Sequence, residues 1–521
     1  MNKQIITDSK TNLLNSGEEL LLAVSHQINL LEKWRLRLDV VGYLLRIDKE
    51  LVNVQFTDLL SDLRKIFLDI NSFKTRVECL SNEVLENYGL EELIQKRKEL
   101  FSRLRVCLSL YACTVTCLNW QSPAIKSSVG TRIGVEKSEV IADWNDYKRD
   151  RSEDTFHCEK LLIENLFKVV DSNVEPVLNI FNSGMGAFTS IIYFLICERI
   201  AKNTILVSSH NYVENNILLK SFFDDKVEIF NENDVESIIE KIHLRKPSIV
   251  FIEMVSNTSS LRIFDVEQII KTTSEKYEKE IYFIVDVTCS VGFENLLDNF
   301  NLPDNIKVIL HGSLLKAPQL GLESVNMGFV QTFGLGNLSK KILDYRTLSG
   351  TNVQDFAANL LPFTTKSFLQ KRMRIIEENA KKLATEIEAI DLNNELIQEV
   401  VYPGLNSHKD FELAKKIGFA GFFFNIKFIE GLNNDKYFEI FTNEVIKIAK
   451  REKCEIIHGA SFGFNHTSVY YSVGWDEPEN HYIRISTGIE TPYEVEKLKK
   501  VFAETFLSLK NSFENNKINN I

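Results

Sequence analysis

The stretch YFIVDVT, residues 282–288, decides the fold, because it is a short apolar run that ends in a carboxylate, Asp286. A run of this length and composition predicts a buried β-strand. Amphipathic runs such as VESIIEKIHL (235–244) and VEQIIKTTSEKY (266–277) predict helices before it. Similar strand candidates are VLNIFNS (177–183), TILVSSH (204–210), KVEIF (226–230), SIVFIEMVS (248–256) and IKVILHGS (306–313). This alternation predicts an α/β fold with a mainly parallel sheet covered by helices.

The first 122 residues have a different character, since they contain no proline. Apolar residues recur at helical spacing in LLAVSHQINLLEKWRLRL (21–38) and ELIQKRKELFSRLRVCLSL (92–110). Ser16-Gly-Glu-Glu19 has the pattern of a capping box, which predicts that the first long helix starts there. We predict an all-helical N-terminal domain over residues 1–122. Its role is either packing and oligomerisation or the docking of a protein partner.

The rest of the chain divides into a linker and two domains. Residues 123–146 are a predicted linker, because this region begins with Pro, Ser and Gly and loses the helical period. A large α/β domain is predicted over 147–375 and a small α+β domain over 376–521. Elements expected near and within the small domain are a helix over 366–390 and strands in GFFFNIKFI (421–429) and YIRISTGIE (482–490).

Composition excludes several classes of function. The formal net charge of −11 argues against nonspecific binding to nucleic acid or to an anionic membrane. The eight cysteines form no CxxC pair, so we expect no metal site. Cys107, Cys113 and Cys117 fall in one predicted helix, where small buried residues are the simpler interpretation. No uninterrupted apolar segment resembles a signal peptide, and we expect a cytoplasmic protein without a membrane anchor.

Three strand ends carry residues suited to chemistry. Ser183-Gly184-Met185-Gly186 lies between a strand and an apolar helix, where backbone N–H groups can bind an anion, although a tight turn explains it equally well. Asp286 ends a strand too apolar to hold an unpaired carboxylate without a large free-energy cost. HGSLLKAP (311–318) places Lys316 after the next strand.

Each feature alone has an ordinary explanation. The chain has 61 lysines and arginines, so a single Ser-x-x-Lys is unremarkable, and Asp286 alone can cap a helix. Together, however, a phosphate turn, an acid and a lysine suit pyridoxal 5'-phosphate. The turn binds the phosphate, the acid keeps the ring nitrogen protonated, and the lysine amine holds the aldehyde carbon and shuttles a proton.

Ordered motifs from about residue 147 to 490 extend this pattern. They are YKR (147–149), SGMGA (183–187), Tyr212, EMVSNT (253–258), VDVT (285–288), VYPGLNSH (401–408) and IRISTGIE (483–490). In this order the motifs resemble those of the Cys/Met-metabolism enzymes that use pyridoxal phosphate, such as cystathionine γ-synthase and γ-lyase. The resemblance implies fold type I, with a seven-stranded, mainly parallel sheet and helices on both faces. It also implies an active site between subunits, and hence a homodimer or homotetramer.

The resemblance implies a role for each matched residue. Cofactor contacts are implied for Gly184, Met185, Tyr212, Asn257, Asp286, Thr288, Ser313 and Lys316, with Tyr147 and Arg149 reaching the phosphate of the neighbouring subunit. Catalytic roles are implied for Lys316, Tyr212 and Asp286. Substrate contacts are implied for Arg484, whose guanidinium suits the α-carboxylate, and for Asn257 and Thr467.

The chain departs from the family pattern in several places, of which residues 462–467 would help to shape the substrate end. Leu315 replaces a hydroxyl residue in Ser-x-Thr-Lys, and Ser152-Glu153-Asp154 replaces Asn-Pro-Thr. Residues 462–467, FGFNHT, replace Leu-Gly-Gly-x-Glu-Ser. The resemblance nevertheless implies elimination or replacement at the γ or β carbon of an amino acid, in particular a sulfur amino acid or an activated homoserine derivative. The alternatives are aminotransfer or C–C bond formation in a specialised pathway, or a catalytically silent relative.

Overall fold

The computed structural model describes ten segments of the chain. These are residues 3–45, 49–116, 153–169, 175–293, 296–298, 300–333, 337–362, 364–390, 395–472 and 481–518. The chain forms two compact units. The first unit is Met1–Glu198 with His311–Lys366, and the second unit is Arg199–Leu310 with Ser367–Ile521. The domain boundaries proposed from the sequence stay a prediction.

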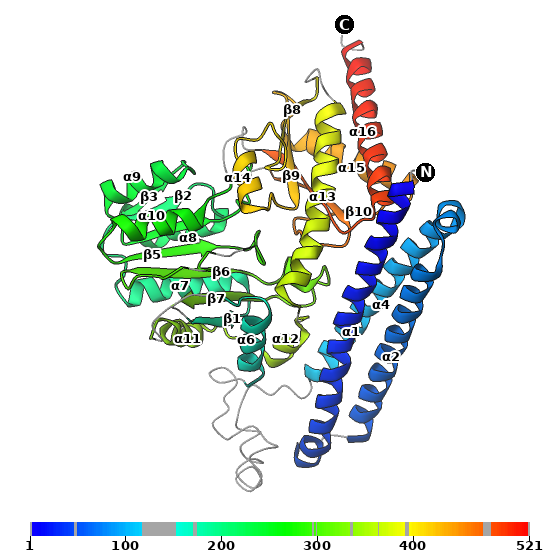
Figure 1. The fold of residues 1–521 in the computed structure, drawn as a ribbon, viewed down its shortest axis with the longest axis horizontal. Helices are drawn as coiled ribbons and strands as arrows, with labels where there is room; N and C mark the ends of the chain where they lie inside the picture. The colour runs from blue at the N-terminus through cyan, green and yellow to red at the C-terminus, as the bar shows by residue number, and fades with distance from the viewer. Residues whose placement is uncertain are drawn as a thin grey trace. The chain divides into compact units, whose positions relative to one another are not determined.

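Long helices form the N-terminal part of the first unit, as the sequence predicted (Figure 1). They are α1 (Lys3–Leu45), α2 (Lys49–Cys79) and α4 (Leu90–Thr116), with the short α3 (Asn82–Val84) and the π-turn η1 (Leu85–Gly89) between α2 and α4. Each long helix packs against the other two through fully buried residues such as Leu13, Leu63 and Leu100. Burial of apolar side chains along one face stabilises helices of this kind.

The predicted start of the first helix at Ser16 is wrong. Helix α1 begins at Lys3, and Ser16 is buried inside it. The Ser16 hydroxyl donates to the carbonyl oxygen of Asn12 at 3.0 Å, one turn earlier in the helix. A serine can make this bond within a helix as well as at its start, so the capping-box pattern alone does not fix a boundary.

The helical bundle packs onto the rest of the first unit. Helix α4 contacts α12 (Asp355–Leu360), which in turn contacts α6 (Glu153–Asn165). The Gln27 side-chain amide of α1 also donates to the carbonyl oxygen of Asn359 at 3.4 Å, and both residues are buried. These contacts favour the interpretation of the bundle as a packing element. The docking of a protein partner on it stays a prediction.

The central sheet has seven strands in the order β1-β7-β6-β5-β4-β2-β3. The strands are β1 (Pro176–Phe181), β2 (Ile205–Ser208), β3 (Val227–Phe230), β4 (Ile249–Glu253), β5 (Ile281–Asp286), β6 (Ile306–Ser313) and β7 (Gly328–Phe333). Strands β3, β2, β4 and β5 pair in parallel, whereas β1 and β7 pair antiparallel. All six strand candidates read from the sequence are strands, and the mainly parallel α/β prediction is confirmed.

Strand β7 was not among those candidates. Its sequence GFVQTF contains two polar residues, yet both Gln331 and Thr332 are buried. The Gln331 amide donates to the carbonyl oxygen of Phe167 at 2.9 Å. A buried polar side chain that finds a partner interrupts the apolar pattern without interrupting the strand.

Helices alternate with the strands, and side chains cap the starts of several of them. They are α7 (Gly184–Cys197), α8 (Val213–Phe223), α9 (Val235–Arg245), α10 (Val266–Lys276) and α11 (Asn337–Ser349), with the 3-10 turn η2 (Asp224–Lys226) after α8. Asp234 and Asp265 accept N–H groups from the first turns of α9 and α10 at 2.8 and 3.1 Å. Among the helices in the described ranges, none has the length and hydrophobicity needed to cross a bilayer.

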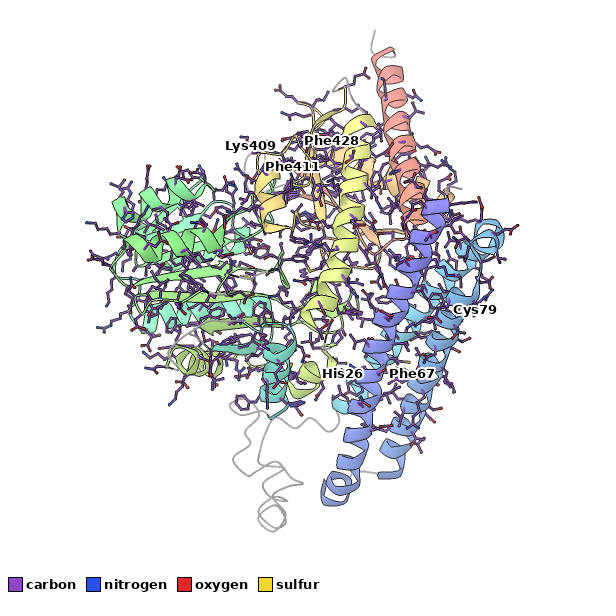
Figure 2. All side chains as sticks on the ribbon, viewed as in Figure 1. His26, Phe67, Cys79, Lys409, Phe411 and Phe428 are labelled. Atoms are coloured by element: carbon purple, nitrogen blue, oxygen red, sulfur yellow. The ribbon has the colours of Figure 1, made fainter. Side chains whose placement is uncertain are left out.

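The C-terminal part of the second unit is α+β, as predicted. Its sheet has the order β10-β11-β12-β9-β8. The elements are α13 (Lys366–Ile390), β8 (Ile397–Val401), α14 (Phe411–Ile417), β9 (Phe423–Phe428), α15 (Asp435–Arg451), β10 (Ile456–His458), β11 (Thr467–Ser472), β12 (Tyr482–Ser486) and α16 (Pro492–Ile518). Phe428, which is labelled in Figure 2, is fully buried in its core. Its ring centroid lies 5.4 Å from that of Phe441 and 6.4 Å from that of Phe506.

A buried ion pair ties α6 to β1 and α11 in the first unit. Arg346 donates to Glu159 at 2.6 Å and to the carbonyl oxygen of Ile180 at 2.8 Å, and the Ile180 N–H donates to Glu159 at 2.9 Å. Both residues of the pair are at most 5% exposed. Removal of one partner leaves a buried charge uncompensated, which costs about 3–5 kcal/mol, whereas an apolar pair is often tolerated.

We therefore expect Arg346→Met to lower the free energy of unfolding by about 3–5 kcal/mol. The double variant Glu159→Leu/Arg346→Met should recover much of the loss. Chemical denaturation followed by circular dichroism measures both. Arg64→Met, which removes an exposed ion pair with Glu32, is the control and should change stability by less than about 1 kcal/mol. Equal stabilities of Arg346→Met and the wild type would contradict this role.

Candidate functional site

The glycine turn predicted as a phosphate site caps a helix in the first unit. Ser183 is the N-cap of α7, and its hydroxyl accepts the Gly186 N–H at 2.9 Å. A Cβ atom added to Gly184 would lie 3.1 Å from Cβ of Ser313, so the turn and the end of β6 are in close contact. The structure thus brings together Gly184 and Ser313, two of the predicted phosphate ligands, at the start of a 14-residue helix.

Lys316 follows Ser313 in the same unit and starts the 3-10 turn η3 (Ala317–Gln319). The Ser313 hydroxyl accepts the Leu315 N–H at 3.2 Å, and Lys316 itself is half-buried. The loop after Lys316 is fixed by Gln319, which is fully buried. Gln319 donates to the carbonyl oxygen of Val325 at 2.5 Å and accepts the Val325 N–H at 3.1 Å. This support could not be predicted from the sequence, because a glutamine in a loop is ordinarily exposed.

Asp286 ends β5 in the second unit, where it is 8% exposed. Its Oδ1 accepts the Thr288 N–H at 2.9 Å, and its Oδ2 accepts the Asn215 side-chain amide at 3.4 Å. Asn215 belongs to α8, which follows Tyr212. Two of the predicted cofactor ligands, Asp286 and Thr288, are therefore in contact, and Asn215 joins them from a helix that the sequence analysis did not single out.

A second carboxyl group, Glu253, lies beside Asp286. The two residues are register partners on the parallel strands β4 and β5, and Glu253 is 1% exposed. Burial raises the pKa of Glu253 well above its ordinary value, and the neighbouring Asp286 raises this pKa further. The Cys289 thiol donates to Glu253 at 3.7 Å. The sequence analysis included Glu253 in the motif EMVSNT but gave it no role, although it ends an apolar strand in the same way as Asp286.

The raised pKa of Glu253 predicts that the difference in stability between Glu253→Gln and the wild type, both without cofactor, depends on pH. Above pH 4.5, the ordinary value for this group, the unfolded chain releases the Glu253 proton while the folded chain keeps it, so Glu253 makes stability fall as pH rises. Glu253→Gln removes this loss. Its stability relative to the wild type should therefore increase by up to about 1.4 kcal/mol for each pH unit above that value.

Denaturant titrations of both proteins between pH 5 and pH 8, about 3 pH units of the relevant window, measure this difference. The exposed Glu280→Gln controls for the loss of one carboxylate near β5. A Glu253→Gln difference that stays constant over the range would mean that the folded Glu253 is ionised, contrary to its burial.

Tyr212 is the N-cap residue of α8, and its hydroxyl donates to Glu214 at 2.9 Å. Burial raises the pKa of Tyr212, and the hydrogen bond to Glu214 raises it further. In this arrangement the phenol keeps its proton at neutral pH. Tyr212 is thus suited to donate a proton rather than to accept one.

Arg484 is the most informative side chain of the second unit. It lies on β12, is 4% exposed, and bonds through Nη1 to Oδ1 of Asn257 and through Nη2 to the Asn257 carbonyl oxygen at 3.3 Å. Nη2 also contacts the Tyr482 hydroxyl at 2.9 Å, and Nε contacts Asn425 at 3.4 Å. Within the described segments, Arg484 has no ion-pair partner, and all four of these contacts are neutral. A buried guanidinium whose hydrogen-bond partners are all neutral is expected to bind an anionic ligand.

The segment that replaces the family sequence at 462–467 is held from α13. Arg372 is 1% exposed and donates to the carbonyl oxygens of Gly463 and Phe464 at 3.1 and 3.2 Å, and to Asn465 Oδ1 at 2.6 Å. Thr467, predicted to contact substrate, starts β11 and is fully buried, with its N–H donating to Glu490. A backbone role is therefore what the structure shows for Thr467, and its substrate contact stays a prediction.

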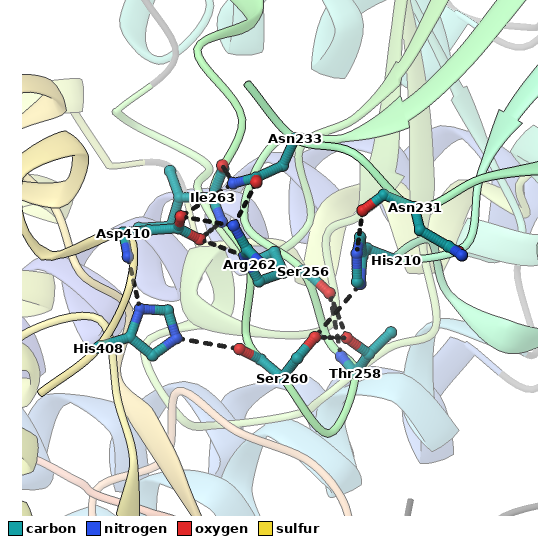
Figure 3. Close-up of polar contacts among 10 residues, drawn as sticks. All are labelled: His210, Asn231, Asn233, Ser256, Thr258, Ser260, Arg262, Ile263, His408 and Asp410. Atoms are coloured by element: carbon teal, nitrogen blue, oxygen red, sulfur yellow. Dashed lines mark hydrogen bonds and ion pairs between the residues drawn. The ribbon is translucent and has the colours of Figure 1, made fainter. Parts of the chain in front are cut away.

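The motif VYPGLNSH leads into a polar cluster of the second unit (Figure 3). The His408 ring donates from Nε2 to the Ser260 carbonyl oxygen at 3.0 Å and accepts the Asp410 N–H at Nδ1, also at 3.0 Å. Burial lowers the pKa of His408, which agrees with this neutral tautomer. The motif thus fixes the loop after Asn257.

Several predicted residues are not placed by this structure. Tyr147 and Arg149 lie outside the described residues, as does the linker before them. The side chains of Cys113 and Cys117 are also outside them, whereas Cys107 is a buried free thiol. In the segments that the structure describes, no group of His, Cys, Asp and Glu is arranged to hold a metal ion.

Known proteins are similar to this chain in sequence or in fold. Bifunctional enzyme flvA of Aspergillus flavus is 28% identical over 347 residues, which are 66% of this chain and 41% of that protein. The chain thus spans about two fifths of the length of this relative. Among solved structures, cystathionine gamma synthase from Xanthomonas oryzae pv. oryzae in complex with cystathionine is 18% identical with a TM-score of 0.54, over 69% of this chain and 87% of that chain. Cystathionine gamma-lyase from Lactobacillus plantarum, complexed with L-serine, is 18% identical with a TM-score of 0.54. The match covers 69% of this chain and 88% of that chain.

The fold class is therefore that of the fold-type-I enzymes that use pyridoxal phosphate. Residues 142–500 match the family described as Cys/Met metabolism PLP-dependent enzyme, which is well over half of the chain. The chain belongs to this family, and pyridoxal phosphate is its cofactor.

The residues present fit that cofactor. A side chain at Gly184 would be crowded against Ser313, and the glycine turn at the start of α7 offers backbone N–H groups to a phosphate. Ser313 adds a hydroxyl beside it. Asp286 supplies a buried carboxylate of the kind that pairs with a ring nitrogen.

Proposed function

We propose that this protein catalyses elimination or replacement at the γ or β carbon of an amino acid, with a sulfur amino acid or an activated homoserine derivative as the substrate. The observation that carries the proposal is Arg484, a buried guanidinium whose four contacts named above are all neutral. The α-carboxylate of an amino acid supplies the missing negative charge in a geometry that the planar guanidinium matches.

In the proposed site, Gly184, Met185 and Ser313 bind the phosphate and Asp286 binds the protonated ring nitrogen, with Thr288 orienting Asp286. Bound pyridoxal phosphate supplies an electron sink for the substrate α carbon. That Lys316 and Asp286 serve the same cofactor is supported by the family match, which covers both residues.

Protons are moved by two residues in this proposal. Nζ of Lys316 would hold the cofactor aldehyde until the substrate amine displaces it, and the freed amine would then accept the proton from the substrate α carbon and return it later. The Tyr212 phenol, whose raised pKa keeps it protonated, donates to the leaving group. Asn257 positions Arg484 through the contacts described above. A homodimer or homotetramer, with Tyr147 and Arg149 reaching the partner subunit, completes the proposal.

Product analysis tests the reaction. The purified yellow protein is incubated with a panel that includes cystathionine, methionine, cysteine and O-acylated homoserines, and products are scored by mass spectrometry. Release of pyruvate, 2-oxobutyrate or a thiol, or a new γ-substituted amino acid, supports the proposal. A 2-oxo acid that retains the whole substrate skeleton shows aminotransfer instead, and a product with a new C–C bond shows carbon–carbon bond formation. Binding of cofactor without any product shows a silent relative.

A further inference from the structure

The loop Ser256–Arg262, here called the asparagine loop, carries Asn257 and is closed at its base. Val255 and Ile263 form an antiparallel bridge on either side of it, and the Ser256 N–H donates to the Arg262 carbonyl oxygen at 2.9 Å. Leu261 adopts a positive φ of 46°, which is strained for a residue of this type. A strained loop holds one conformation only when its surroundings fix it.

An ion pair at the base of the loop supplies this restraint (Figure 3). Arg262 donates to both carboxylate oxygens of Asp410, from Nε at 2.8 Å and from Nη2 at 3.0 Å. The same carboxylate accepts the Ile263 N–H at 3.0 Å and the Asn233 amide at 2.9 Å. Burial by itself raises the pKa of Asp410, but the hydrogen bonds from Arg262 and Ile263 lower it below its ordinary value. Asp410 thus stays ionised, and its carboxylate accepts hydrogen bonds from four donor groups of Asn233, Arg262 and Ile263.

The tip of the loop is held at two further points. His408 donates to the Ser260 carbonyl oxygen at 3.0 Å, and His210 contacts the Ser260 hydroxyl at 3.2 Å. On the other side, the Asn425 amide donates to the carbonyl oxygens of Thr258 and Ser259 at 3.0 and 3.2 Å. Asn425 also contacts Arg484, its register partner on β12. The loop and Arg484 therefore share their supports.

We propose that Arg262 and Asp410 are positioning residues for the α-carboxylate site: by fixing the asparagine loop they hold Asn257 against Arg484 and so set the affinity for the amino-acid substrate. This inference rests on the proposed function. Asn257 is bonded to Arg484 through both its side chain and its carbonyl oxygen, so a displaced loop leaves the guanidinium free to turn. A displacement of about 1 Å at such a site can lower kcat/KM by up to about 100-fold.

The test compares Asp410→Asn and Arg262→Lys with a matched control. Both variants keep the size and polarity of the side chain, but Asp410→Asn loses the charge and Arg262→Lys loses the two-point contact. The control is Lys416→Met, which removes the Lys416–Asp265 ion pair of 2.6 Å. Like the Arg262–Asp410 pair, it links the chain near the end of the asparagine loop to the region of α14. The Lys416 side chain, however, is 64% exposed.

Each holoprotein is assayed for KM and kcat on the best substrate of the panel. Binding of glycine, which has the carboxylate but no leaving group, is followed by the change in the visible spectrum. We expect Asp410→Asn and Arg262→Lys to raise KM and the glycine Kd by about 10-fold or more, with kcat within about threefold of the wild type. The cofactor Kd should stay within about twofold, and Lys416→Met should match the wild type in all values.

The outcomes separate the two proposals. If Asp410→Asn or Arg262→Lys binds cofactor and shows unchanged KM and glycine Kd, the positioning role is wrong. A fall in kcat with unchanged KM also overturns it. If Asp410→Asn does not fold, Arg262→Lys decides, because it keeps a cation next to Asp410. A wild-type protein that binds cofactor but responds to no amino acid overturns the proposed function itself.

Discussion

Replacement of Lys316 with alanine should abolish turnover while leaving the fold intact. The amine is the proposed covalent anchor of the cofactor and the group that moves the α proton. Loss of proton transfer alone typically costs about 10²–10⁴-fold in rate. We expect kcat to fall by at least about 10³-fold and the protein to lose the yellow colour of covalently bound cofactor, measured by stopped assays and by absorbance.

Lys307→Ala is the matched control, because Lys307 lies on the same strand β6 and bonds only to the Asp304 carbonyl oxygen among the contacts described for it. It should keep wild-type turnover and colour. Thermal unfolding shows whether each variant is folded. Turnover by Lys316→Ala within about tenfold of the wild type would rule out the proposed proton transfer.

Replacement of Arg484 with methionine should remove most of the substrate affinity. Loss of one partner of a buried charge pair typically costs about 2–5 kcal/mol. We therefore expect kcat/KM to fall by roughly 30- to 4,000-fold, mainly through KM. The kcat/KM of Arg484→Lys should lie between those of the wild type and Arg484→Met, since lysine keeps the charge but lacks the planar guanidinium. Steady-state kinetics on the best substrate measures both.

Arg451→Met, which removes an exposed arginine of α15, is the control and should leave kcat/KM unchanged. The cofactor content of Arg484→Met should match that of the wild type, because Arg484 has no proposed contact with the cofactor. An Arg484→Met enzyme with an unchanged KM would place the α-carboxylate elsewhere.

The fold was largely predictable because most strands of the central sheet are short apolar runs that alternate with amphipathic helical runs. Strand β5 and its terminal Asp286 were read directly from YFIVDVT, and the helix over 366–390 matches α13. Strand β7 escaped because buried polar residues break its pattern, and Ser16 misled because its hydroxyl bonds within α1. Local sequence does not distinguish these cases, since the partner that satisfies the polar group comes from the folded structure.

Sequence analysis identified residues proposed to contact a ligand more readily than residues that support them. Residues proposed to contact a ligand directly, such as Ser313 and Arg484, lie in motifs with recognisable spacing. Residues that support them, such as Gln319, Arg372 and Asp410, do not, because each acts through a contact distant in sequence. Arg262 and Asp410 are 148 positions apart in the chain. Glu253 is the exception, since its place at the end of a buried strand was a usable signal.

The most direct test of the account is the location of the covalent link to the cofactor. The wild-type holoprotein is reduced with borohydride, digested and analysed by peptide mass spectrometry. The account predicts a single phosphopyridoxyl modification, on the peptide that contains Lys316. A modification on a different lysine, or none in a protein that carries the cofactor, would contradict it.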